Sequence, residues 1–227
     1  MAGLIITIDG PAASGKSTVA QLLAERLGVS FLDTGAMYRA VTLAAIRAGT
    51  DMNNEEKLLS ILDDVEFQFV TRGRKMTVCI DDVNVTEQIR QPEVTAKARY
   101  IASSAKLRNR LVQLQRQLAA GKEKIITEGR DQGTVVFPDA DIKFYLTADK
   151  SERARRRQVE LRAKGNSESL EKIQKTIEDR DKSDENRTVG PLKPANDAII
   201  VDTTDLSIKE VVEKLLCCVK EKCLKQT

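Results

Sequence analysis

The sequence predicts an α/β fold in which a five-stranded parallel sheet is flanked by helices and interrupted by a small antiparallel β lobe. Short β-branched, apolar runs alternate with longer amphipathic stretches. A glycine-rich turn follows the first such run, and one stretch in the first half of the chain alternates with a period of two. At 227 residues, the chain is long enough for one large domain with an insertion.

Composition is typical of a soluble globular protein, with 41% hydrophobic residues, 31% charged residues and a formal net charge of +3. This net charge is too small to indicate a nucleic-acid partner. The four cysteines form no C-x-x-C pair, and the chain has no histidine to complete a zinc site. No run approaches the ~18 apolar residues of a membrane span. We therefore expect a cytoplasmic protein with reduced thiols and without a membrane or nucleic-acid partner.

The first strand-length run is Leu4 to Ile8, and apolar residues recur at helical spacing from Val19 onward. Between them lies a match to G-x-x-x-x-G-K-[ST], formed by Gly10, Pro11, Ala12, Ala13, Ser14, Gly15, Lys16, Ser17 and Thr18. Its glycines allow N–H groups to point inward, and the following helix adds its positive end, so the segment predicts a phosphate-binding P-loop. Lys16 would reach the β- and γ-phosphates and Ser17 would bind Mg2+. A simple turn is the alternative.

A second strand is expected over Val29 to Leu32, and polar residues follow it. Strand ends of this kind bind ligands in open α/β sheets. Thr34 is expected to cap the next helix, and Arg39 lies about one turn into that helix. Arg39 is either a solvated charge or a phosphate ligand.

The helical pattern changes to period-two alternation between Asp63 and Thr86. Two alternating runs on either side of Gly73 predict an antiparallel hairpin. We therefore predict an inserted lobe over residues 63–102, with the P-loop core formed by residues 1–62 and 103–227.

Three further β runs complete the predicted sheet, at residues 124–127, 142–146 and 198–201. Their long, mostly helical connections require parallel pairing. Ser207 and Glu210 form a capping box at the start of the last helix.

A densely charged helix is expected between the last two strands, and residues 150–166 are predicted to form a lid. Arg153, Arg156 and Arg157 share one face, with few acidic residues among them. This face is either solvated or a mobile cover over phosphates. Arg180 and Asp184 follow one turn apart on the next helical stretch.

Four segments of the chain resemble the bacterial cytidylate kinase family, and the resemblance covers nearly the whole sequence. They are residues 10–18, 32–40, 128–140 and 190–198. The second and third segments are specific to that family, whereas many proteins share the first.

This resemblance implies a monomeric kinase that transfers a phosphate from ATP to CMP or dCMP with Mg2+. The residues it implies for the acceptor phosphate are Arg39, Arg130 and Arg187, with Thr34 beside them. Arg108 and Asp131 would bind the cytosine edge, and Arg180 and Asp184 the ribose. The implied catalytic set is Lys16, Arg39, Arg130, Arg153, Arg156, Arg157 and Arg187.

Two positions depart from the family pattern. Arg99 stands where a serine commonly contacts the cytosine amine, and Glu128 stands where an aspartate is usual. Because arginine only donates hydrogen bonds, it would tolerate the keto oxygen of uracil better than the amine of cytosine, unless it pairs with Asp131 or Asp184.

Three other functions are weighed against this one. A kinase of the same fold acting on UMP, a sugar acid or shikimate is the nearest alternative. A GTPase-type switch is disfavoured because no N-K-x-D or D-x-x-G motif follows the P-loop. A nucleic-acid binder is disfavoured by the low net charge and the absence of tryptophan.

Overall fold

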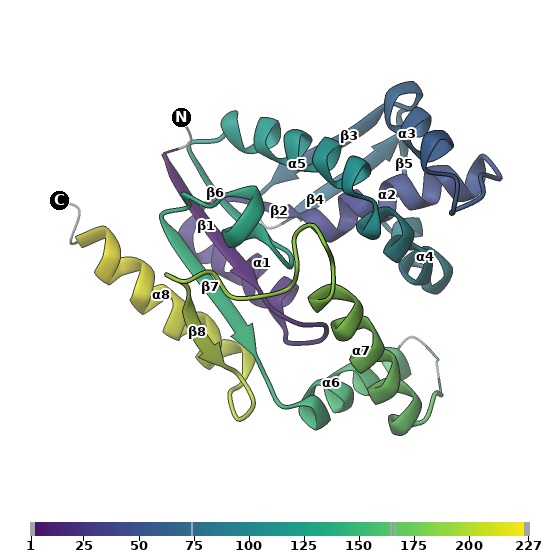
Figure 1. Cartoon of the computed structure of the whole chain (residues 1–227). Coiled ribbons are helices and arrows are strands. Elements are labelled where there is room, and N and C mark those ends of the chain that lie inside the picture. Colours follow the sequence, from purple (N-terminus) through teal and green to yellow (C-terminus); the bar gives the residue numbers. More distant parts are fainter. Residues whose placement is uncertain (1–2, 74, 164, 166, 225–227) are drawn as a thin grey trace.

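Five short apolar runs form one parallel sheet, as predicted, and the structure gives the strand order as β2-β6-β1-β7-β8 (Figure 1). The computed structural model describes residues 3–73, 75–163, 165 and 167–224. The strands of this sheet are β1 (Leu4–Asp9), β2 (Ser30–Asp33), β6 (Lys124–Glu128), β7 (Ile142–Thr147) and β8 (Ile199–Asp202). Because the pairing is parallel throughout, all five carboxyl ends meet at one edge.

Helices cover both faces of this sheet. On one face lie α1 (Lys16–Leu27) and α8 (Ile208–Leu224), and on the other α2 (Thr34–Arg47) and α5 (Ala105–Ala120). The remaining α-helices of the described residues are α3 (Glu55–Asp64), α4 (Pro92–Ser103), α6 (Lys150–Ala163) and α7 (Leu170–Glu185). The neighbours Ile125 and Ile126 point to opposite faces, as successive strand residues must. Ile126 packs in the cluster that includes α1 and α8, whereas Ile125 packs in the cluster that includes α2 and α5.

The predicted hairpin is present and gains a third strand. β3 (Phe67–Arg72), β4 (Lys75–Ile80) and the two-residue β5 (Val83–Asn84) form an antiparallel sheet in that order. Phe69 and Val78 of this sheet are buried in the same cluster as Val41 of α2. The small sheet therefore packs directly on the core.

Two helix starts test the capping predictions. The capping box is confirmed, because Ser207 N donates to Glu210 Oε2 at 2.8 Å and Glu210 N donates to Ser207 Oγ at 3.3 Å. The prediction that Thr34 caps α2 is wrong. Asp33 is the N-cap, and its Oδ1 accepts from Ala36 N at 2.8 Å. The Thr34 hydroxyl donates instead to the carbonyl of Glu128 on the adjacent strand, at 2.7 Å.

The predicted lid lies at the carboxyl edge of the sheet. Figure 1 shows α6 and α7 packed as a pair beyond the end of β7. None of the helices in the described residues is long and apolar enough to span a bilayer. The cysteines Cys79, Cys217 and Cys218 are free, and the side chain of Cys223 lies outside the described part of the structure.

Replacing Met37 by alanine should lower the free energy of unfolding by about 2–5 kcal/mol, because its side chain is fully buried between α2 and the sheet. Val159→Ala is the matched control, since Val159 is 60% exposed on α6 and should change this free energy by no more than about 0.5 kcal/mol. Urea unfolding followed by circular dichroism measures both. Equal effects of the two substitutions would contradict the described core.

Candidate active site

The glycine-rich loop connects β1 to α1 at the carboxyl edge of the sheet, as predicted. Gly10 has a φ of 145°, and a Cβ there would lie 2.0 Å from the carbonyl oxygen of Leu146. Gly15 has a φ of 87° and is the residue before the first turn of α1. These two positions require glycine, because a side chain would clash at the first and strain the backbone at both.

Lys16 is buried and folds back over this loop. Its Nζ donates to the carbonyl of Pro11 at 2.5 Å and to the Ser14 hydroxyl at 3.2 Å. Burial, followed by the positive charge of Arg130, holds the pKa of Lys16 well below its usual value. The negative charge of an anion bound in the loop would stabilise the protonated form of Lys16 and so oppose this shift.

The hydroxyl of Ser17 donates to Glu128 Oε1 at 2.7 Å, which joins the start of α1 to the end of β6. Burial, and then the charge of Asp33, raise the pKa of Glu128. Hydroxyl and carboxylate oxygens are ligands that Mg2+ prefers, and this ion commonly needs only one or two protein groups beside phosphate and water. The pair therefore fits Mg2+, although no cluster of three cysteine or acidic side chains that could hold a metal occurs among the described residues.

Asp33, at the end of β2, holds two arginines. Its Oδ2 lies 3.1 Å from Nη2 of Arg39 and 3.2 Å from Nη2 of Arg90. Arg90 was not anticipated from the sequence, because it lies on a short 3-10 helix (Gln88–Arg90) and its partner is 57 residues away. Only its place just before the proline-started helix α4 marks it, and that signal is weak.

Asp184, on α7, also holds two arginines. Its Oδ2 accepts from Arg130 Nε at 2.8 Å, and its Oδ1 accepts from Arg187. The three side chains are 4%, 17% and 13% exposed. Burial opposes the charge on Asp184, but Arg130 and Arg187 outweigh it and lower the pKa of this carboxyl. Three predicted site residues are thus brought together from two segments.

Arg180 lies beside this group and, within the described residues, makes no hydrogen bond or ion pair. Its side chain reaches solvent, but surrounding protein atoms, and then the charge of Arg130, lower its pKa to about 10. The charges of Arg39 and Arg187 act in the same direction. Positive charge therefore exceeds negative charge here, which is the condition for binding phosphate.

Arg108 and Asp131 form a buried ion pair, with exposed fractions of 2% and 4%. The guanidinium of Arg108 lies 5.7 Å from the centre of the Tyr38 ring. Burial raises the pKa of Asp131 even though Arg108 opposes this shift. Gly190 passes directly over the pair, where a Cβ would lie 2.2 Å from both side chains. Both residues predicted to contact the base are thus side by side.

Arg99 is exposed on α4 and contacts its neighbour Tyr100. Its Nη2 donates to the Tyr100 hydroxyl at 3.3 Å, and its guanidinium lies 5.0 Å from the ring centre. The alternative that Arg99 pairs with Asp131 or Asp184 is not realised, since those carboxylates hold other arginines.

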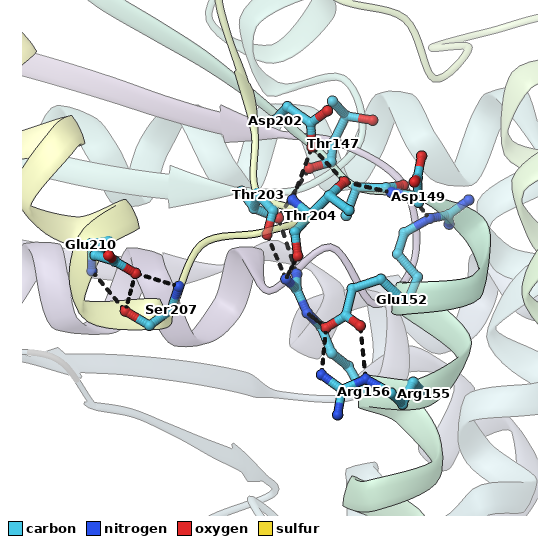
Figure 2. A network of polar contacts seen from close by, with 12 residues as sticks. Thr147, Asp149, Glu152, Arg155, Arg156, Asp202, Thr203, Thr204, Ser207 and Glu210 are labelled. Atoms are coloured by element: carbon cyan, nitrogen blue, oxygen red, sulfur yellow. Dashed lines mark hydrogen bonds and ion pairs between the residues drawn. The ribbon is translucent and has the colours of Figure 1, made fainter.

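The lid arginines all have acidic partners, although no acidic residue lies between Arg153 and Arg157 in the sequence. Figure 2 shows Arg156 beside Glu152 and beneath the loop after β8, where it donates to the Thr203 hydroxyl at 3.0 Å. Arg157 donates to Glu160 at 2.7 Å. Arg153 is buried and pairs with Asp181 of α7, so the three side chains do not share one environment.

Asp9 ends β1 and is a further residue that the sequence analysis missed. Its two oxygens accept from the backbone N–H groups of Gln132 and Gly133, at 2.8 and 2.7 Å. They thereby fix the turn after Arg130 and Asp131. Burial raises the pKa of Asp9 to about 7 despite these two hydrogen bonds. An acidic residue at a strand end directly before a phosphate loop was the available signal.

The contribution of Asp9 to stability should fall as pH rises from about 4 to about 7. The folded chain retains a proton on Asp9 in this interval, whereas the unfolded chain, with an ordinary pKa of 3.8, releases it. The free energy of unfolding of wild type minus that of Asp9→Asn should therefore decline with pH and level off above 7. Urea titrations at a series of pH values measure it, with Glu213→Gln as an exposed control. A pH-independent difference would contradict the assignment.

Comparison with known proteins identifies the family of this chain. A family model described as cytidylate kinase matches residues 6–221. A cytidylate kinase of Desulfitobacterium hafniense (strain Y51) is 44% identical over 219 residues, covering 96% of this chain and 94% of that protein. One from Halalkalibacterium halodurans is 46% identical over 217 residues, covering 96% and 97%. A solved shikimate kinase from Bacteroides thetaiotaomicron, 12% identical, shares the fold, with a TM-score of 0.50 over 96% of this chain and 98% of that one. The chain belongs to the cytidylate kinase family of phosphotransferases.

Proposed function

We propose that this chain transfers the γ-phosphate of ATP to CMP or dCMP and releases ADP and CDP or dCDP. The observation that carries the proposal is the surplus of positive charge at the carboxyl edge of the sheet. There, Lys16 is buried and Arg180 is surrounded by protein atoms although it reaches solvent, and the positive charge of Arg130 lowers both pKa values further. Two anionic phosphates meeting in this place would neutralise that surplus.

ATP would occupy the loop from Gly10 to Thr18, with its phosphates on the inward N–H groups and on Lys16. Mg2+ would be held by the Ser17 hydroxyl, with Glu128 contacting it through water. When bound, the ion neutralises charge on the transferred phosphate. Release of Ser17 from Glu128 would free both oxygens for this purpose.

The acceptor phosphate would bind Arg39, Arg130 and Arg187, with the Thr34 hydroxyl beside them. Asp33 and Asp184 hold these guanidinium groups in place before the substrate arrives. Each arginine can then exchange part of its carboxylate contact for phosphate oxygens, which it binds in pairs. Arg90 shares Asp33 with Arg39, and we assign it to the same phosphate.

The nucleoside would lie between α7 and the buried pair of Arg108 and Asp131. Arg108 would donate to the cytosine acceptors, and Asp131 would accept from the exocyclic amine. Arg180 and Asp184 would bind the ribose. The buried pair provides both a donor and an acceptor, which is the pattern that a cytosine edge requires.

Catalysis would need positioning and charge stabilisation but no general base. The acceptor phosphate is already an anion at neutral pH, so its oxygen can attack the γ-phosphate without losing a proton. The protein therefore has to hold two repelling phosphates in line and stabilise the spreading charge. The cations named above supply this stabilisation.

Closure of the predicted lid and of the 63–102 lobe would exclude water from the reacting phosphates. Arg157 could exchange its partner Glu160, which lies on the same helix, for phosphate. Arg156 would have to release both Glu152 and the loop after β8, where it donates to Thr203. The substrates and the free thiols of the described cysteines fit a cytoplasmic protein.

Replacing Arg130 by alanine should reduce kcat with CMP about 100-fold or more, since the transferred charge would lose a buried donor. The melting temperature is the control for folding. Arg26→Ala is the matched variant, because Arg26 pairs with Glu213 on the surface and is 54% exposed. Coupled-assay turnover near the wild-type value for Arg130→Ala would refute the assignment.

UMP is the alternative acceptor, and Arg99 is the reason to test it. Arg99→Ser should raise the preference for CMP over UMP about fivefold, because a guanidinium near the base favours the keto oxygen of uracil by one hydrogen bond. The ratio of kcat/KM values across CMP, dCMP, UMP and AMP measures it. Lys97→Ser, an exposed change on the same helix, should leave the ratio unchanged. An unchanged ratio for Arg99→Ser would mean that Arg99 does not contact the base.

A further inference from the structure

We propose that Arg153 and Asp181 are positioning residues that hold the apex of the ATP loop and couple it to the acceptor site. We call this pair the Ala12 clamp. The inference rests on the proposed function, since it concerns how the two nucleotide sites communicate. It assigns Arg153 a part other than contact with phosphate.

Both polar backbone groups of Ala12 are bound by the clamp. Asp181 Oδ1 accepts from Ala12 N at 2.9 Å, and Arg153 Nη1 donates to the Ala12 carbonyl at 3.0 Å. Arg153 Nη1 also donates to Asp181 Oδ2, and its Nε donates to the Ala148 carbonyl at 3.1 Å. A single loop residue is thus gripped by one side chain from α6 and one from α7.

The clamp is buried, so it is not an incidental surface contact. Arg153 is 4% exposed and Asp181 is 6% exposed. Ala12 also packs in a small buried apolar cluster with Ala154, Ile173 and Ile177. Because the surroundings are apolar, neither charge could remain without the other.

The next loop residue explains why this place needs to be held. Ala13 has a φ of 58°, a backbone conformation that residues other than glycine adopt only at a cost in free energy. Surrounding contacts must impose such a conformation. The clamp acts on the adjacent peptide and thereby fixes the path of the loop through Ala13.

The same helix carries the acceptor-site residues. Asp184, one turn after Asp181 on α7, holds Arg130 and Arg187, which we assign to the acceptor phosphate. A shift of α7 on acceptor binding would therefore move Asp181 against the ATP loop. In this way the two sites share one element whose position both ligands bias, as energetic coupling requires.

The experiment measures this coupling directly. The Kd of a non-hydrolysable ATP analogue is determined by calorimetry without CMP and with saturating CMP, and the ratio of the two values is the coupling factor. For wild type we expect a factor of about 5 or more. For Asp181→Asn, which keeps the side-chain shape but removes the charge, we expect a factor within about twofold of 1, with the Kd of CMP alone unchanged.

A double variant separates positioning from stability. Arg153→Met combined with Asp181→Leu replaces both buried charged side chains by apolar ones that suit their apolar surroundings. This double variant should therefore fold even where Asp181→Asn alone does not. Its melting temperature should match or exceed that of wild type, while its coupling factor should still fall to about 1. A residue pair with only a structural role would not give this separation. Glu213→Gln, which breaks an exposed ion pair, should retain the wild-type factor.

Two results would overturn the inference: a wild-type coupling factor of 1, or a wild-type factor retained by the folded double variant. Failure of the proposed function is distinguishable from both, because it would appear as wild-type protein that transfers no phosphate from ATP to CMP. An active wild type with coupling that is insensitive to the clamp would refute only the clamp.

Discussion

Repulsion among cations at one edge of the sheet is the constraint on which the site depends. Two carboxylates, Asp33 and Asp184, each hold two guanidinium groups in this region, and neither can neutralise both of its partners. The remaining repulsion contributes to the lowered pKa values of Lys16 and Arg180. Folding tolerates this repulsion because hydrophobic clusters on both faces of the sheet fix the strands, whatever the charges at their ends. A bound phosphate then supplies the negative charge that is missing from this edge of the folded chain.

Parallel pairing of the strands brings the residues of this site together at one edge of the sheet. The end of β6 lies between the ends of β1 and β2, so Glu128 meets Ser17 on one side and Thr34 on the other. The turn that follows β6 is held by Asp9 from β1. The residues that we propose for the donor and acceptor nucleotides are therefore joined by a few hydrogen bonds between neighbouring strand ends.

Local pattern was sufficient to predict much of the fold. The five strands, the antiparallel insertion and the glycine-rich loop each depend on spacing within a few residues, and each was predicted. The two-residue β5 is too short to leave such a pattern. The cap of α2 was assigned one residue too late, because Thr34 found a better acceptor on β6, a contact invisible in sequence. Arg90 and Asp9 were missed for the same reason, as their partners are 57 and 123 residues away.

The lid helix shows why residue type alone does not assign a role. Arg155 pairs with Glu152 one turn away and is 66% exposed, so solvent screens the pair and it contributes little to stability. Arg153, two residues earlier, is 4% exposed and pairs with Asp181 on another helix, 28 residues away. Helical periodicity places the two side chains on different faces, and the element that each face meets decides whether the charge is solvated or structural. On α6, the exposed Arg155 thus pairs with Glu152 of the same helix, whereas the buried Arg153 pairs with Asp181 of α7 and also bonds the Ala12 carbonyl of the glycine-rich loop.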